Sequence, residues 1–304
     1  MTFDSMQFPV EVQALLKTAM RQETSCGTGS MVWHGWGQAS CNPAHAPVVL
    51  LHGGSGSWTH WLRNIAVLVG SGRWVLAPDL PGFGDSASPL TGNDADVLPE
   101  LVEQGMQHLL GREACDLVGF SFGGMVAGLL AEQFPGRVAR LVLVGAPGLG
   151  IDPEKAIRLN AWRHLAEPER DEVHRSNLAT MMFFRPDSTT ETALRLHMAN
   201  VLRDRMQGRK LSRTDLLARS LAQVLCPVYG IYGLEDALFR GRIQALEPAL
   251  RHAPDFRTLT LIEAAGHWVQ YEQADAFNEA LQAALRAAPG SVVGANSQPA
   301  QALS

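Results

Sequence analysis

Residues 115–124 read Cys-Asp-Leu-Val-Gly-Phe-Ser-Phe-Gly-Gly, and the Gly-x-Ser-x-Gly pattern within them occurs once in the chain. An apolar run precedes the pattern and a helical one follows it, which predicts a strand, a sharp turn and a helix. Side chains at Gly119 and Gly123 would collide with the neighbouring strand and helix, and the turn strains the backbone of Ser121. We therefore expect Ser121 to be an exposed nucleophile beside a helix N-terminus, whose N–H groups can face an oxyanion.

Short apolar, β-branched runs recur on both sides of this motif, and helical stretches separate them. Such alternation predicts an α/β fold with a mostly parallel central sheet and helices on both faces. The expected strands are 47–51, 74–77, 116–119, 141–144, 228–232 and 258–262, with one or two antiparallel edge strands within 27–38. The expected helices are 8–22, 98–110, 123–133, 242–252 and 272–287.

The segment 152–223 interrupts the alternation, because it is helical in character and contains no convincing strand. We interpret it as an inserted helical cap over the carboxyl ends of the strands, where open α/β sheets bind their ligands. The alternative is a second helical layer without a gating role. The core would then comprise residues 1–151 and 224–288, and residues 289–304, which lack periodicity, would form a flexible tail.

Two later strands each end in a loop that carries a titratable side chain. A serine hydroxyl needs a base, and the base needs a carboxylate that orients it. His267 lies in a Gly-flanked loop directly after the last predicted strand, and Asp236 follows the strand before it. Glu235 and Asp152 are the competing carboxylates, and a helix N-cap is the structural alternative for Asp236.

The loop 52–58 follows the first predicted parallel strand and is rich in glycine. Its backbone N–H groups can approach a substrate closely, so we expect Gly54 to supply one oxyanion donor and Phe122 the other. His52 is expected to hold the loop by hydrogen bonds. The loop lacks the spacings Gly-x-x-x-x-Gly-Lys and Gly-x-Gly-x-x-Gly, which makes a nucleotide site improbable.

Together these segments resemble the α/β-hydrolase superfamily across residues 47–287, and most closely the meta-cleavage product hydrolases. The likeness rests on the segments 52–54, 63–64, 79–86, 145–150 and 266–275. It implies hydrolysis of a carbon–carbon bond in vinylogous 1,5-diketones, and packing of Trp268 against the substrate. Epoxide hydrolases and haloalkane dehalogenases share the fold but place Asp where this chain has Ser121.

The chain departs from the meta-cleavage pattern at two positions that would face the substrate. Phe120 and His60 stand where that family usually has Asn, so an ordinary ester also becomes a candidate substrate. The resemblance implies that Arg195 corresponds to the cap arginine of that family, which is a carboxylate partner. The alternative for Arg195 is a solvated helix residue.

The composition of the chain limits the classes of partner that it is expected to bind. The chain of 304 residues is 46% apolar and 18% charged, with a formal net charge of −5 and no basic block, so neither nucleic acid nor a membrane surface is an expected partner. Its start shows no signal peptide and its four cysteines are scattered, which favours a cytoplasmic protein without a zinc site. Homo-oligomer formation remains open.

The sequence as a whole predicts a serine hydrolase that acts on a small carbonyl substrate and needs neither metal nor cofactor. An acyltransferase or a cofactor-free perhydrolase with the same three residues is the first alternative, because one triad can serve different acceptors. The second alternative is a ligand-binding protein that keeps the pocket but turns over little.

Overall fold

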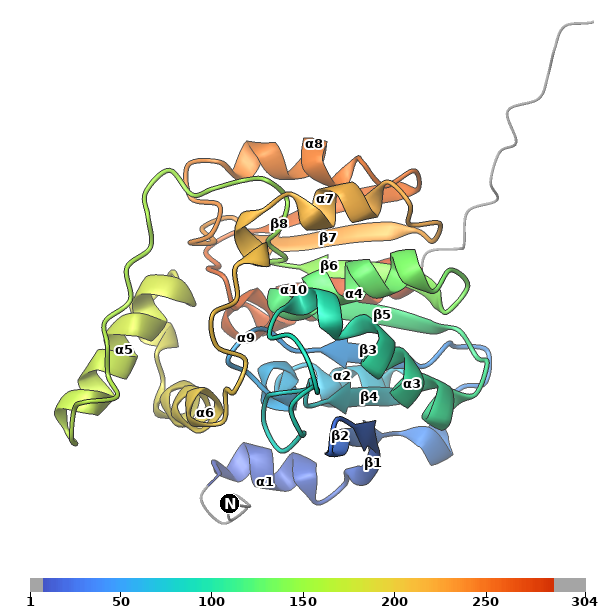
Figure 1. Ribbon diagram of the computed structural model, residues 1–304, viewed down its shortest axis with the longest axis horizontal. Helices are drawn as coiled ribbons and strands as arrows, with labels where there is room; N and C mark the ends of the chain where they lie inside the picture. Colours follow the sequence, from blue (N-terminus) through green and yellow to red (C-terminus); the bar gives the residue numbers. More distant parts are fainter. Residues whose placement is uncertain (1–7, 287–304) are drawn as a thin grey trace, which may run out of the picture.

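The computed structural model describes residues 8–286, which form an eight-stranded sheet flanked by helices (Figure 1). The strand order is β1-β2-β4-β3-β5-β6-β7-β8. Pairing is antiparallel for β1 with β2 and for β2 with β4, and it is parallel elsewhere. The mostly parallel sheet is therefore confirmed. The strands are β1 Met20–Cys26, β2 Gly29–Trp36, β3 Val48–Leu51, β4 Val75–Pro78, β5 Cys115–Phe120, β6 Val138–Val144, β7 Val228–Gly233 and β8 Phe256–Ile262.

The N-terminal part of the sheet differs from the expectation. A helix was expected over 8–22, but α1 covers only Val10–Leu16, and β1 begins at Met20. The cause is tertiary, because every residue of β1 from Met20 to Cys26 pairs with β2. This pairing outweighs the helical preference of the local sequence. The antiparallel edge strands expected within 27–38 are correct for β2, whereas β1 lies just before that range.

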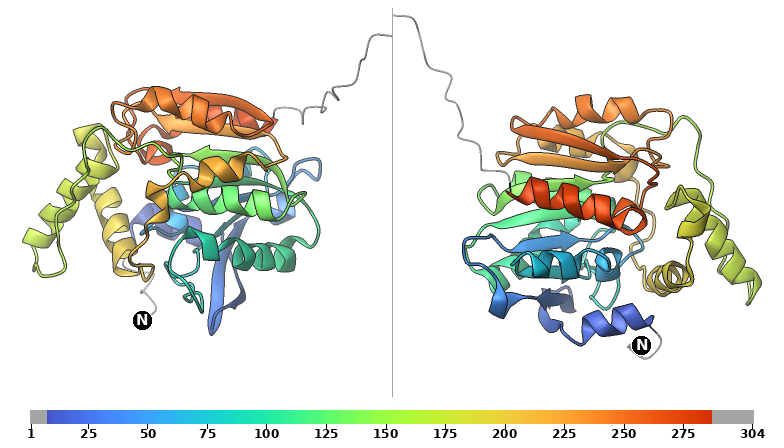
Figure 2. Two further views of the ribbon diagram at one scale, coloured as in Figure 1. Left: turned by 45° about the horizontal axis from the view of Figure 1, so that its top comes forward. Right: turned by 180° about the vertical axis from the view of Figure 1, so that it is seen from behind.

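Helices cover both faces of the sheet, as Figure 1 and the right-hand view of Figure 2, which shows the molecule from behind, make visible. One face carries α3 Pro99–Leu110, α4 Phe122–Gln133, α7 Leu216–Leu221 and α8 Leu246–Leu250, and the other carries α2 Ile65–Gly70 and α10 Ala274–Arg286. The strands β3 and β5 to β7 are almost fully buried, since two hydrophobic cores enclose them.

Two of the expected helices are shorter or divided. The range 242–252 holds a 3₁₀ turn at Ile243–Ala245 and only then α8. The range 272–287 holds the end of α9, Val269–Glu272, and then α10, with a break at Gln273, whose φ and ψ are −119° and 58°. The expected tail, 289–304, lies outside the described residues.

A buried ion network ties the amino end of β5 to its surroundings. Asp116 is inaccessible to solvent, and its carboxylate accepts hydrogen bonds from Arg73 at 2.7 Å and from Arg140 at 2.9 Å. The Arg73 guanidinium also donates to the backbone carbonyl of Leu285, at the end of α10. The network thus joins strand and helix at the end of the sheet opposite Ser121.

The segment between β6 and β7 contains α5 Glu169–Met181, α6 Glu191–Leu202 and α7. Helices α5 and α6 lie beside the carboxyl ends of the strands, apart from both helix layers (Figures 1 and 2). In contrast, α7 packs on α4, and a Cβ at Gly128 would lie 2.2 Å from Leu217. The division of the chain at residues 152 and 223 stays a prediction. Across residues 8–286, no helix combines the length and apolar character needed to cross a bilayer.

Candidate active site

Ser121 occupies a strained turn between β5 and α4. Its φ and ψ are 51° and −118°, a left-handed conformation that is costly for a residue with a side chain. Its N–H donates to Val144 O at 2.7 Å, which fixes the turn against β6. A Cβ at Gly119 would lie 2.4 Å from Gly123 O, and one at Gly123 would lie 2.4 Å from His52 O. The steric requirement for both glycines is therefore confirmed.

An imidazole and a carboxylate complete a chain of hydrogen bonds that begins at Ser121. His267 Nε2 lies 2.9 Å from Ser121 Oγ, and His267 Nδ1 lies 2.8 Å from Asp236 Oδ2. The other carboxylate oxygen of Asp236 accepts the N–H of Leu238 at 2.9 Å. The structure thus brings Asp236, rather than Glu235, to the imidazole. Both members of the His–Asp pair are buried, which shields their interaction from water.

Gly145, which directly follows β6, supports this pair. Its φ is 53°, and a Cβ there would lie 3.2 Å from the His267 ring and 3.3 Å from Asp236 Oδ2. A side chain at this position would press on the hydrogen bond between the two. Before the structure, Gly145 stood out only as part of the family likeness, because its role depends on strands that meet in space.

The glycine-rich loop after β3 lies against the turn of Ser121. His52 Nε2 accepts the N–H of Leu80 at 2.8 Å, and His52 Nδ1 lies 2.8 Å from Gly53 O, so its structural role is confirmed. A Cβ at Gly53 would lie 3.2 Å from the Ser121 Cβ. Gly54 follows and lines the cavity described next. This places the loop within reach of a substrate bound to Ser121.

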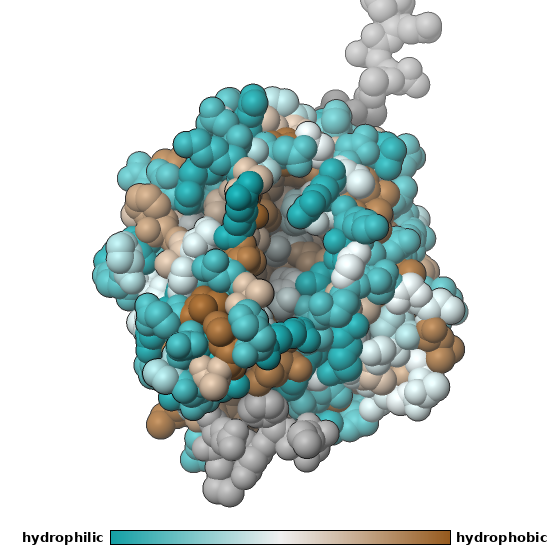
Figure 3. Space-filling view, turned by 60° about the vertical axis from the view of Figure 1, so that its left-hand side comes forward, coloured by the Kyte–Doolittle hydropathy of each residue, from teal (hydrophilic) through white to brown (hydrophobic). Residues whose placement is uncertain are grey.

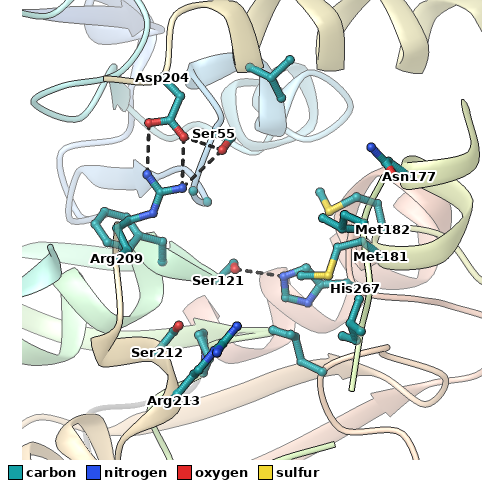
Figure 4. Close-up of a pocket in the computed structure, with 18 of the residues that line it drawn as sticks. Ser55, Ser121, Asn177, Met181, Met182, Asp204, Arg209, Ser212, Arg213 and His267 are labelled. Atoms are coloured by element: carbon teal, nitrogen blue, oxygen red, sulfur yellow. Dashed lines mark hydrogen bonds and ion pairs between the residues drawn. The ribbon is translucent and has the colours of Figure 1, made fainter. Parts of the chain in front are cut away.

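A cavity of about 950 Å³ opens above Ser121. The space-filling view shows a hollow with a largely hydrophilic rim on the side of α5 and α6 (Figure 3). Figure 4 shows methionine side chains on one side of the serine and a pair of opposite charges on the other. The walls of the cavity come from the core loops and from the segment after β6. They include Phe120, Phe122, Ile151, Ile157, Trp162, Met181, Met182, His197, Val201, Leu238 and Phe239.

His60 and Phe120 both line the cavity, as expected. Burial, followed by the effect of three neighbouring imidazoles, holds the pKa of His60 well below 6.5, so its ring is neutral near pH 7. The N–H of Gly53 donates to His60 Nδ1 at 3.2 Å, which assigns the ring proton to Nε2. The ring of Phe120 packs 5.3 Å from His60 and 5.0 Å from His267.

Two residues carried over from the family likeness are not brought to the cavity. Trp268 is buried, its indole N–H donates to His60 O at 3.0 Å, and its ring stacks on Tyr271 at 4.3 Å. It supports His60 from behind, outside the cavity wall. Arg195 lies on the exposed side of α6 and pairs with Glu191 at 2.7 Å. Its position therefore matches the alternative of a solvated helix residue.

The cavity wall also holds a charged pair that no sequence pattern had indicated. Arg209 Nη2 lies 3.0 Å from Asp204 Oδ2, and the same carboxylate oxygen accepts a hydrogen bond from Ser55 Oγ at 2.5 Å (Figure 4). Both charged residues follow α6 in an irregular segment. No periodicity or motif marks such a segment, so only its place in the fold could reveal the pair.

The geometry defines what the site can do chemically. The imidazole can take the proton of the serine hydroxyl, and helix α4 begins directly after Ser121, where its first N–H groups have no partner within the helix. Within residues 8–286, no group of three or more His, Cys, Asp or Glu side chains is placed to hold a metal ion.

Comparison with known proteins agrees with this architecture. A 2-hydroxy-6-oxo-6-phenylhexa-2,4-dienoate hydrolase from Burkholderia cepacia is 30% identical over 251 residues, which cover 76% of this chain and 84% of that protein. A 2-hydroxy-6-oxononadienedioate/2-hydroxy-6-oxononatrienedioate hydrolase from Comamonas testosteroni is 29% identical over 250 residues, with the same shares covered. A solved mutant of a meta-cleavage product hydrolase (CumD) superposes with a TM-score of 0.69 at 24% identity, covering 86% of this chain and 97% of that chain.

The model of the Alpha/beta hydrolase family matches residues 48–280, a range that contains Ser121, Asp236 and His267. The likeness inferred from the sequence is thereby confirmed. The chain belongs to the alpha/beta hydrolase family.

Proposed function

We propose that the protein is a serine hydrolase that cleaves a carbonyl substrate through an acyl-enzyme on Ser121. The observation that carries the proposal is the unbroken chain of hydrogen bonds from the hydroxyl through His267 to Asp236. In this mechanism the hydroxyl oxygen attacks the carbonyl carbon while its proton passes to His267 Nε2. The leaving group takes that proton, and water then releases the acid with the same base.

The charge that develops on the carbonyl oxygen needs preorganised donors. We propose that the N–H groups of Gly54 and Phe122 supply them, because both residues line the cavity next to Ser121. Loss of one such donor typically raises the barrier by about 3 kcal/mol. Asp236 keeps the ring proton of His267 on Nδ1, so that Nε2 stays free to accept.

Two substrate classes fit this mechanism. The names of the relatives favour a vinylogous diketone, since the protein from Burkholderia cepacia is named for a 6-oxo dienoate. The cavity wall favours an ester, because an aromatic ring at Phe120 and a neutral imidazole at His60 stand where the meta-cleavage family usually has amides. Location in the cytoplasm stays a prediction.

A fluorophosphonate probe tests the proposed chemistry. We expect stoichiometric labelling of the wild type and none of Ser121→Ala, while Ser212→Ala, which changes another serine of the cavity wall, should still be labelled. Labelling that persists in Ser121→Ala, or that fails in the wild type, would contradict the proposal.

Aryl esters of graded acyl length, assayed beside a vinylogous diketone, distinguish the two substrate classes. We expect Phe120→Asn to shift the ratio of kcat/KM values toward the diketone, because it restores an amide next to the nucleophile. Phe120→Leu is the matched control, since it removes the ring without adding an amide. An unchanged ratio in Phe120→Asn would show that Phe120 does not set the substrate class.

A further inference from the structure

The loop that carries Gly54 takes part of its conformation from a segment distant in sequence. Ser55, the next residue, has a φ of 50°, a strained conformation for a residue with a side chain. Its hydroxyl donates to Asp204 Oδ2 at 2.5 Å, across 149 positions in the sequence. Such strain persists only where surrounding contacts fix it, and this hydrogen bond is one of those contacts.

Asp204 is itself held firmly. Its Oδ1 accepts the N–H of Met206 at 2.9 Å and Arg209 Nη1 at 3.0 Å, and its Oδ2 accepts Arg209 Nη2 at 3.0 Å. The carboxylate side chain is only 4% exposed. This bidentate contact between the Arg209 guanidinium and the Asp204 carboxylate fixes the orientation of the carboxylate as well as its distance. Ser55 therefore donates to an acceptor that cannot rotate away.

Arg209 closes the arrangement by packing on the residue next to Ser55. A Cβ at Gly54 would lie 3.3 Å from Arg209 Nη2 and 3.6 Å from both Cζ and Nε, so the flat guanidinium faces the Gly54 backbone. The same group lies 5.4 Å from the ring centroid of Phe122. It therefore contacts both residues whose N–H groups are the proposed oxyanion donors.

We propose that Asp204 and Arg209 are positioning residues, which hold the Gly54 N–H in the direction that an oxyanion on Ser121 requires. This inference rests on the proposed function. The ion pair is close to neutral as a unit, so it acts through geometry rather than through charge. Donors of this kind work only within roughly 2.7–3.1 Å of the oxyanion, and a displacement of about 1 Å can cost about 100-fold in rate.

The effect is specific to the transition state, which gives the test its readout. An aryl boronic acid becomes tetrahedral and anionic on a serine hydroxyl and so reports on the oxyanion donors, whereas KM for an aryl ester reports mainly on ground-state binding. We expect Asp204→Asn to lower kcat and the boronate affinity by a similar factor, about 10- to 100-fold, with KM changed by less than about 3-fold.

Asp94→Asn is the matched control. Asp94 accepts the N–H groups of Lys210 and Leu211, so it anchors the same segment by the same kind of carboxylate without lining the cavity. We expect Asp94→Asn to keep kcat and boronate affinity within about 3-fold of the wild type. Equal losses in Asp94→Asn and Asp204→Asn would overturn the proposal, because anchoring alone would then explain them.

A second variant covers the case in which Asp204→Asn does not fold. Ser55→Gly keeps the left-handed conformation accessible but removes the hydroxyl, and should lower kcat and boronate affinity together. A rise in KM with unchanged boronate affinity would overturn the proposal. A wild type that the fluorophosphonate probe does not label would refute the proposed function itself, which separates the two failures.

Discussion

Asp236→Asn replaces one carboxylate oxygen by an amide nitrogen at the centre of the candidate site. The structure determines which oxygen is replaced. The N–H of Leu238 donates to Oδ1 at 2.9 Å, and this position must remain an oxygen. The amide NH₂ therefore takes the place of Oδ2 and faces His267 Nδ1 at about the present 2.8 Å. Two N–H donors cannot point at each other, so the ring proton moves from Nδ1 to Nε2.

The misplaced proton removes the base. Nε2–H then points at Ser121 Oγ, 2.9 Å away, and donates where it should accept. In serine hydrolases with this chain of hydrogen bonds, the same exchange lowers kcat by about 10⁴, or about 5.5 kcal/mol of barrier. We expect a loss of that size here, because both His267 and Asp236 are buried and no water can take over the role of the carboxylate.

The assay compares kcat for an aryl ester, and the rate of fluorophosphonate labelling, between the wild type and two variants. Glu235→Gln is the matched control, since its carboxylate is one position away and is not brought to the imidazole. We expect it to stay within about 3-fold of the wild type in both rates. A loss below about 10-fold in a folded Asp236→Asn protein would refute the assignment of the orienting carboxylate.

Two further predictions concern stability. Asp116→Asn should lower the free energy of unfolding in urea by about 3 kcal/mol with kcat unchanged, because the buried Arg73 and the partly buried Arg140 lose the carboxylate that they share far from Ser121; a loss below about 1 kcal/mol would contradict this. Burial, and then the nearby His174, lowers the pKa of His197 to about 3. Because the unfolded chain binds this proton at a higher pH than the folded protein, the contribution of His197 to the free energy of unfolding is complete above pH 6.5. It declines as the pH falls toward 3, by up to about 1.4 kcal/mol per pH unit. In urea titrations between pH 7 and 5, we expect His197→Gln to reduce the loss of unfolding free energy with falling pH. An unchanged pH dependence would argue against the burial of His197.

The sequence predicted the parallel sheet and the loops of the candidate site because these follow from local pattern. Apolar runs of four or five residues marked β3 to β8, and the carboxyl ends of parallel strands meet at one edge. Ser121 directly follows β5, and Asp236 and His267 lie in the loops that follow β7 and β8, so chain order and strand direction sufficed to bring them together. The glycines at 119 and 123 were also predictable, since their requirement arises within the turn itself.

The remaining features depend on contacts that no local pattern encodes. Residues 20–22 looked helical, yet pairing with β2 makes them a strand. Trp268 was assigned to the substrate by family likeness, but the carbonyl of His60 takes its indole N–H and turns the ring away from the cavity. Asp204 and Arg209 lie in an irregular stretch that carries no motif, and they acquire a role only because that stretch folds back over the loop of Ser55.

The segment after β6 contacts loops of the candidate site on both sides of the cavity. It therefore helps to hold these loops in place as well as covering the site. On one side, the carboxylate of Asp204 holds Ser55 next to Gly54. On the other side, Glu272 accepts the N–H of Phe184 at 3.1 Å and also that of Gly266, directly before the candidate base, at 2.6 Å. A Cβ at Gly266 would lie 2.7 Å from Phe184 N, so the two segments are in close contact there. A rigid displacement of the whole segment would break both connections and disturb the site, so we expect any opening that admits substrate to come from residues 151–168, which precede both connections, rather than from the segment as a unit.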